Sequence, residues 1–417
     1  MAIINRLKIF IYKLLRRSQK YTGTDNVYLA RGGFWLTLSQ GALMVAAFLL
    51  AIAFANVLDP TVYGNYKYIL SLVGLLGVFS FPGIRAAIHQ AIACGLEGSF
   101  YTGFRAQLKW SVLGSLAAII GAVYYWFRGN EILPIPLLIT AVFFPLMEAS
   151  QIYLSFLSGK KLFNVQAKYT ITNQIAIVII TIGALLVSQN LFWLTAVYLI
   201  SRTVLNYTFY LITATKFKPN KQEDSKTISF GLHLSAMAFM GQIASYLDKV
   251  MVFTFIGSSQ LAIYSFATLA PEQIQNILGN ISTLALPKLA ARSREEIRAN
   301  IMKKVWKLFL LTLAVIIIYI IIAPFFFQIF FPKYLDSVHY SQVFIISIIS
   351  LPITLLGTAL QVKMMKKELY WMKSKSFVRV GLYAILIPLF GIWGAIASII
   401  GAELFGIGLI FFLFKRF

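Results

Sequence analysis

The chain has 417 residues, of which 59% are apolar and only 12% are charged, and its mean hydropathy is +0.78. A soluble domain is typically about 45–50% apolar and about 25% charged, so the composition excludes an ordinary soluble protein and predicts an all-α integral membrane protein. The net charge of +23 does not indicate nucleic-acid binding, because the basic residues lie between apolar segments. The one cysteine excludes an intramolecular disulfide, and the three separated histidines form no metal-ligand motif. We therefore expect no metal and no cofactor.

The N-terminal segment, residues 1–30, is basic but has no continuous apolar core and no small-residue cleavage site after it, so it is not a signal peptide. Ile3, Leu7 and Leu14 form part of an apolar stripe that lies opposite lysine and arginine side chains on a helix. We interpret the segment as an amphipathic arm on the cytoplasmic membrane surface.

Apolar segments of spanning length predict about twelve transmembrane helices, for a hydrocarbon core of ~30 Å. With both ends on one side, 31 of the 37 lysines and arginines lie on that side, while Lys67, Arg128 and Lys333 lie on the other. The positive-inside rule then places both termini in the cytoplasm. We expect a multi-pass protein of the cell inner (cytoplasmic) membrane. The predicted helices cover approximately 33–55, 67–88, 108–127, 132–156, 169–188, 191–213, 230–256, 261–287, 307–331, 339–361, 372–388 and 391–414.

The longest polar link between central helices, 216–229, divides the chain into two six-helix lobes, 31–215 and 230–417. A weak internal repeat at an offset of 198 residues aligns the segment 31–36 with 229–234 and the turn at 58–66 with 256–264. Two such halves run in parallel, a common plan of transporters in which the bundles face each other across a cleft. The alternative is chance similarity between apolar segments.

Four segments carry a resemblance to a known family. They are the opening helix, the turn Leu58-Asp59-Pro60 with Tyr63-Gly64 and Tyr66, the run 246–251 (YLDKVM) and the turn 262–265 (AIYS). In these segments the chain resembles the polysaccharide transporter family, and the resemblance extends from about Arg31 to the C-terminus. The family includes the Wzx-type O-antigen flippases and belongs to the multidrug/oligosaccharidyl-lipid/polysaccharide (MOP) superfamily. The resemblance implies two pseudo-symmetric six-helix bundles in a V shape, with a cationic central cavity. The implied activity is transfer of an undecaprenyl-diphosphate-linked oligosaccharide, an O-antigen, capsule or exopolysaccharide repeat unit, across the cytoplasmic membrane. Candidate partners are the bilayer, H⁺ or Na⁺, and other polysaccharide-assembly membrane proteins.

Charged residues within the predicted spans are the candidate functional residues, because each costs about 2.5–3.5 kcal/mol at the bilayer centre unless it is paired or faces water. Lys249 shares a helical face with Gln242 and Tyr246, and Glu272 shares one with Asn276 and Asn280. We predict that these two stripes line the cleft of the second lobe. The charged residues are Arg85, Glu148, Arg202, Asp248, Lys249, Glu272 and Glu403.

Two interpretations of these charges stay open. In the functional one, Arg202, Lys249 and Arg85 attract the anionic head group, and an acid among Glu272, Glu403, Glu148 and Asp248 takes part in ion coupling. In the structural one, Lys249 pairs with Glu272, and Arg202 pairs with Glu403 or Glu148, to fix helix packing.

Other functions are weighed against the flippase. A multidrug and toxin extrusion (MATE) antiporter often has an acidic cation site in its first helix, which 33–55 lacks, and Arg202 and Lys249 disfavour cationic substrates. The lipid II flippase branch usually has fourteen helices. A membrane-embedded glycan polymerase or ligase usually needs a large outer loop, and the loops here, such as 332–339, are short. We therefore expect a transporter and not an enzyme.

Overall fold

The computed structural model describes residues 26–290, 292–363 and 365–415, so most of the predicted arm at 1–30 lies outside the described residues. Within these ranges every regular element is an α- or 3₁₀-helix. The all-α fold class predicted from composition is confirmed.

The first half of the chain consists of long helices, some of them broken, that run back and forth in antiparallel passes. They are α2 (Asn26–Val57), α3 (Pro60–Leu76), η1 (Gly77–Ser80), α4 (Gly83–Ala93), α5 (Ser99–Phe127), α6 (Pro134–Ser150), α7 (Ile152–Gly159), α8 (Phe163–Val187) and α9 (Leu191–Phe217).

The second half repeats this plan and ends in the longest helical stretch. Its elements are α10 (Lys226–Ala244), α11 (Leu247–Ile256), α12 (Ser258–Ala290), α13 (Arg294–Phe330), η2 (Pro332–Tyr334), α14 (Ser337–Phe344), η3 (Ile345–Ile353), α15 (Thr354–Val362), α16 (Lys366–Met372) and α17 (Ser374–Phe414).

The described helices form twelve passes that are long enough to cross a membrane, the number predicted. Nine helical stretches are long and apolar enough to span, and the last of them, Lys367–Phe414, has 48 residues, enough for two passes. Gly391, at φ +60° and ψ −130°, breaks that stretch between the two passes, as only glycine readily does. Helices α9 and α12, of 27 and 33 residues, supply the remaining two passes, since about 20 residues span the hydrocarbon core.

The second pass begins earlier than predicted. Asp59 caps α3, its side chain accepting a hydrogen bond from the backbone N–H of Thr61 at 2.8 Å, and Pro60 occupies the first turn. The hydrogen bond from the Thr61 hydroxyl, and to a smaller extent the one from this N–H, lowers the pKa of the Asp59 carboxyl. Lys67 therefore lies two turns inside the helix, and its prediction as a residue of the outer loop is wrong.

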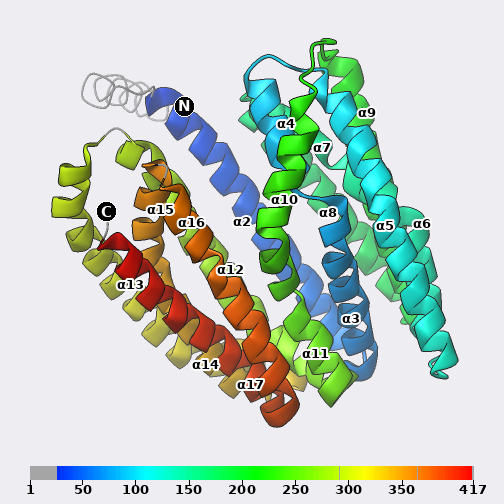
Figure 1. Ribbon diagram of the computed structural model, residues 1–417. Coiled ribbons are helices and arrows are strands. Elements are labelled where there is room, and N and C mark those ends of the chain that lie inside the picture. Colours follow the sequence, from blue (N-terminus) through cyan, green and yellow to red (C-terminus); the bar gives the residue numbers. More distant parts are fainter. Residues whose placement is uncertain (1–25, 291, 364, 416–417) are drawn as a thin grey trace, which may run out of the picture.

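The two halves form a V (Figure 1). They meet at the end of the molecule that carries the turns at Asp59 and Lys333, which we call the closed end, and they separate at the end that carries the segment 218–225, which we call the open end. At the closed end α3 packs against α11 and α12. The ring of Tyr63 stacks on Phe266 at 4.6 Å, and Lys333 Nζ donates to the carbonyl of Asn56 at 2.8 Å.

The segment between α9 and α10 is fixed to the first half. Asn220 Nδ2 donates to the carbonyl of Gly95 at 3.0 Å, and the N–H of Gly98 donates to the carbonyl of Gln222 at 2.8 Å. Helix α10 then packs against α4, where the N–H of Gly83 donates to Ser235 Oγ at 2.9 Å. Most of α10 belongs to the predicted second lobe, yet this helix contacts the first half closely. The division into lobes at 31–215 and 230–417, with a linker at 216–229, therefore stays a prediction.

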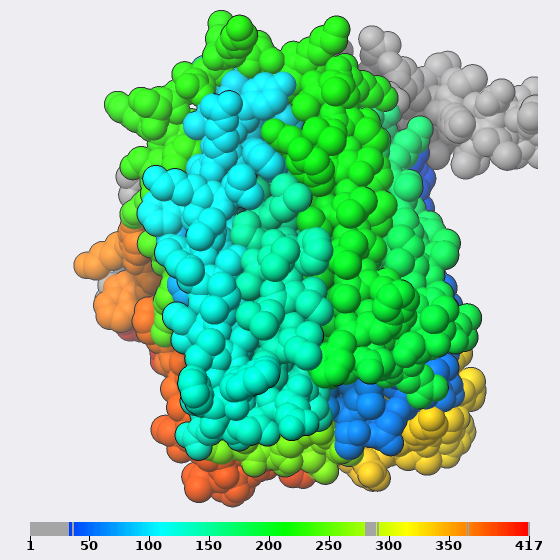
Figure 2. Space-filling view, turned by 90° about the vertical axis from the view of Figure 1, so that its right-hand side faces the viewer, coloured from blue at the N-terminus to red at the C-terminus, as the bar shows by residue number. Residues whose placement is uncertain are grey.

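The outer surface of the first half is apolar. Figure 2 shows this face, formed by α5, α6 and α9. Large hydrophobic side chains on these helices are exposed, Val142 by 71% and Ile120 by 70%. Exposed apolar area of this extent is typical of a surface that contacts lipid.

Candidate functional site

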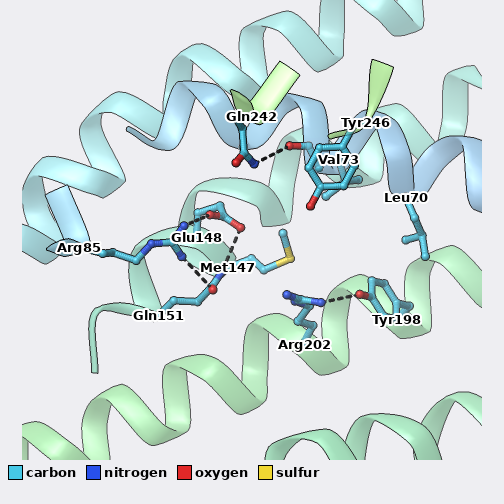
Figure 3. A pocket seen from close by; sticks show the side chains of 12 residues that line it. Leu70, Val73, Arg85, Met147, Glu148, Gln151, Tyr198, Arg202, Gln242 and Tyr246 are labelled. Atoms are coloured by element: carbon cyan, nitrogen blue, oxygen red, sulfur yellow. Dashed lines mark hydrogen bonds and ion pairs between the residues drawn. The ribbon is translucent and has the colours of Figure 1, made fainter. Parts of the chain in front are cut away.

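A polar cavity of about 330 Å³ opens inside the first half, beside α10 (Figure 3). Helices α3, α4, α6, α9 and α10, with the breaks at Gln151 and Tyr246, bring its walls together. Its lining is Leu70, Val73, Gly74, Gly77, Arg85, Met147, Glu148, Gln151, Tyr198, Arg202, Gln242 and Tyr246.

Glu148 is held by neighbours on every side. Arg85 Nη2 lies 3.5 Å from one carboxylate oxygen, and Ser80 Oγ donates to the same oxygen at 3.2 Å. Gln151 Nε2 donates to the other oxygen at 2.9 Å, while Arg85 Nη1 donates to Gln151 Oε1 at 2.9 Å. The carboxylate, in a residue that is only 9% exposed, is thus neutralised and hydrogen-bonded, as a buried charge requires.

Arg202 carries the excess charge of the cavity. Its Nη1 donates to the hydroxyl of Tyr198 at 2.6 Å, and the guanidinium carbon lies 5.8 Å from the centre of that ring. Among the described residues no carboxylate comes within 4.0 Å of it, so the predicted structural pairing with Glu148 or Glu403 is not formed. The cavity therefore holds two guanidiniums and one carboxylate, and most of the five N–H donors of Arg202 are available for an anion.

The stripe predicted on 242–249 is divided between two places. Gln242 and Tyr246 reach the cavity, and Gln242 Nε2 donates weakly to the carbonyl of Gly74 at 3.4 Å. A Cβ on Gly74 would lie 2.3 Å from the ring of Tyr246, so the glycine lets the ring approach. The break between α10 and α11 then turns Lys249 away from the cavity, to pair with Glu272 at 3.2 Å.

A second polar cluster lies where α3, α11, α12 and α17 meet. Asp248, only 3% exposed, accepts a hydrogen bond from the hydroxyl of Tyr264 at 2.7 Å. Its other carboxylate oxygen has no partner, and within the described part of the chain no basic group lies within 4.0 Å. Arg379 donates to the hydroxyl of Tyr383 at 2.6 Å and acts on Asp248 electrostatically.

The remaining predicted residues lie apart from both clusters or cannot be placed. Glu403, 5% exposed, pairs with Lys375 at 2.5 Å and accepts from Ser350 Oγ at 2.5 Å inside the second half. Asn276 lies one turn after Glu272 on α12, and it is exposed. The side chain of Asn280 lies outside the described residues.

Several residues at these sites were not predicted from the sequence. Tyr198 stands four residues before Arg202 and Gln151 three after Glu148, which are spacings that bring side chains together on a helix. Those spacings could have identified both. Lys375 and Arg379 fall within the predicted helix 372–388 and lie on α17, but neither was among the candidate residues.

Comparison with known proteins places the chain in a family. The model of the polysaccharide biosynthesis protein family matches residues 29–290, well over half of the chain. No curated protein sequence matches it significantly.

Solved structures share its fold at low identity. The lipid II flippase MurJ, in an inward closed conformation, is 15% identical with a TM-score of 0.70, over 93% of this chain and 87% of that one. An inward-facing multidrug resistance MATE family transporter of the MOP superfamily is 12% identical with a TM-score of 0.63, over 92% and 93%. A MOP superfamily transporter from Pyrococcus furiosus is 13% identical with a TM-score of 0.61, over 93% and 95%. The chain thus belongs to the polysaccharide biosynthesis protein family and has the two-bundle fold of the MOP superfamily transporters.

Proposed function

We propose that the protein is a flippase that moves an undecaprenyl-diphosphate-linked oligosaccharide across the cytoplasmic membrane by alternating access. The observation that carries the proposal is the excess positive charge of the cavity, where Arg202 has no carboxylate within 4.0 Å among the described residues. A guanidinium with free donors binds phosphate well, because its planar fork matches two phosphate oxygens.

The other lining groups suit a sugar. Gln151, Gln242, Tyr198 and Tyr246 offer amide and phenol groups of the kind that hydrogen-bond hydroxyls. A volume of about 330 Å³ is within the range of small-molecule sites. In this proposal the cavity takes the diphosphate and the first sugar, and the open end of the V, with both chain termini, faces the cytoplasm.

Ion coupling is proposed for Asp248. Glu148, Glu272 and Glu403 each have a basic partner within 4.0 Å, whereas Asp248 has none in the described part of the chain. A buried carboxylate with a free oxygen is a candidate acceptor for H⁺ or Na⁺. Asp248→Asn should abolish the dependence of transport on an imposed H⁺ or Na⁺ gradient, and transport that still follows either gradient would exclude this role.

A drug or cation antiporter is the competing proposal, because MATE transporters share the fold. The charge of the cavity opposes it, since an organic cation would meet two arginines and one neutralised acid. The two proposals differ in the substrates that they allow.

The test uses both a cell and a reconstituted system. In a strain that depends on this chain, the double variant Arg202→Ala, Lys249→Ala should abolish surface glycan without loss of protein from the membrane. In proteoliposomes, the unaltered protein should move a fluorescent polyprenyl-diphosphate oligosaccharide and leave ethidium untransported. Arg128→Ala, an exposed cation at the closed end, is the matched control. Normal glycan in the double variant would refute the anionic-substrate proposal.

A further inference from the structure

Lys67, Lys249 and Glu272 form a charged cluster on the boundary between the two halves. Lys67 comes from α3, Lys249 from α11 and Glu272 from α12. Lys249 Nζ lies 3.2 Å from Glu272 Oε1, and the two side chains are 16% and 38% exposed. The helix that carries Lys67 packs against both α11 and α12, and Lys67 Nζ lies 5.9 Å from the centre of the Tyr63 ring, which itself stacks on Phe266 of α12.

The cluster contains more positive than negative charge. Glu272 balances one ammonium, and among the described residues no carboxylate lies within 4.0 Å of Lys67. Asp248 is the neighbour of Lys249 in the sequence, but its carboxylate is hydrogen-bonded to the hydroxyl of Tyr264. An uncompensated cation inside a membrane protein is costly and is typically kept for function.

The cluster lies next to the substrate cavity. Leu70, which lines the cavity, is three residues after Lys67 on α3, and that separation is about 4.5 Å along a helix axis. Lys67 lies nearer the closed end than Leu70, because α3 starts there at Pro60. An anion that leaves Arg202 toward the closed end therefore reaches Lys67 and Lys249 next.

We propose that Lys67 and Lys249 form a second phosphate site, which receives the diphosphate of the substrate from the cavity, and that Glu272 occupies it as an internal counter-anion until then. This inference rests on the proposed flippase function. Phosphate oxygens replace the Glu272 carboxylate at Lys249 Nζ and also neutralise Lys67. Because Lys67 belongs to the first half and Lys249 to the second, separation of the halves at the closed end pulls the two ammonium groups apart and releases the anion.

The test measures binding of farnesyl diphosphate, a short soluble polyprenyl diphosphate, to the purified full-length protein, with farnesol as the uncharged control. Glu272→Gln removes the competing carboxylate, so it should tighten binding by about tenfold, equivalent to about 1.4 kcal/mol. The same variant should show a larger ligand-induced rise in melting temperature than the unaltered protein, because the ligand restores the missing negative charge. Lys67→Gln should weaken binding by about tenfold, and Arg128→Gln should leave it unchanged.

The outcomes separate the two proposals. A purely structural ion pair predicts that Glu272→Gln lowers thermal stability and leaves affinity for farnesyl diphosphate unchanged or weaker, which would overturn the second site. Lys67→Gln removes no ion pair among the described residues, so its folding is not at risk and unchanged affinity would also overturn the site. If Arg202→Gln abolishes binding of farnesyl diphosphate while Glu272→Gln and Lys67→Gln leave it unchanged, the second site fails and the flippase proposal stands. If the unaltered protein binds farnesyl diphosphate no better than farnesol, the flippase proposal itself fails.

Discussion

Gly64 offers the sharpest test of how the closed end is held. It lies on α3 against the start of α12, and a Cβ added to it would lie 1.9 Å from the carbonyl oxygen of Ser258. Real Cβ contacts stay beyond about 3.0 Å, so Gly64→Ala must move these backbones apart by more than 1 Å. Overpacking of this kind typically costs about 1–3 kcal/mol. The substitution destabilises only the conformations in which α3 and α12 are in contact. The population of these conformations, relative to those in which the two helices are apart, should therefore fall by roughly 5- to 150-fold.

Spin labels can measure this change directly. The one native cysteine, Cys94, is replaced by serine, and labels are placed at Asn56 of the first half and Asp336 of the second, both exposed at the closed end. Pulsed electron resonance should show a longer Asn56–Asp336 distance in Gly64→Ala than in the parent protein. Gly183→Ala, where an added Cβ meets nothing within 4 Å, is the matched control.

Two results would contradict the reasoning about Gly64. One is a distance distribution identical to that of the parent, with normal thermal stability, which would mean that Ser258 yields without separating the halves. The other is a loss of stability with no longer distances, which would mean that the strain unfolds α3 locally and that the contact does not control the closed end.

Three further predictions concern the charged residues and the orientation. Arg202→Gln should weaken farnesyl diphosphate binding by roughly 10- to 100-fold, the value of one or two charged hydrogen bonds, whereas Tyr198→Phe should weaken it only a few-fold; equal effects would mean that Tyr198 binds the ligand itself. Lys375→Met leaves Glu403 buried without its cation, so it should lower the free energy of unfolding by on the order of 3 kcal/mol, and Glu403→Gln added to it should restore most of the loss in thermal unfolding measurements. Cys94 is exposed, and its neighbour Gly95 is hydrogen-bonded to Asn220 of the segment at the open end. It should react with a membrane-impermeant maleimide in inside-out vesicles and not in intact spheroplasts; the reverse result would overturn the cytoplasmic orientation.

The number of passes could be predicted because it depends on the lengths of apolar segments. Even the boundary between the short predicted helix 372–388 and its successor 391–414 coincides with the break at Gly391. The start of the second pass was missed because Lys67 has the polarity of a loop residue, while the cap at Asp59 and Pro60, which fixes the helix start, was interpreted only as a turn. Ion pairs between distant helices, such as Lys375 with Glu403, could not be predicted, since they depend on which faces meet. Lys249 and Glu272, on consecutive helices, were correctly considered as a pair.

The positions of the ion pairs relative to the boundary between the halves explain which charges are free for a substrate. Arg85 and Glu148 both lie in the first half, and Lys249 and Glu272 both lie on α11 and α12 of the second. Such pairs survive a rigid movement of the halves, which alternating access requires. Arg202 and Lys67 lie in the first half near that boundary, and a carboxylate from the other half would tie the two bundles together in one state. A substrate anion that binds and leaves in each transport cycle neutralises Arg202 and Lys67 without holding the two halves together. A negatively charged substrate therefore fits these two cations better than a permanent carboxylate partner would.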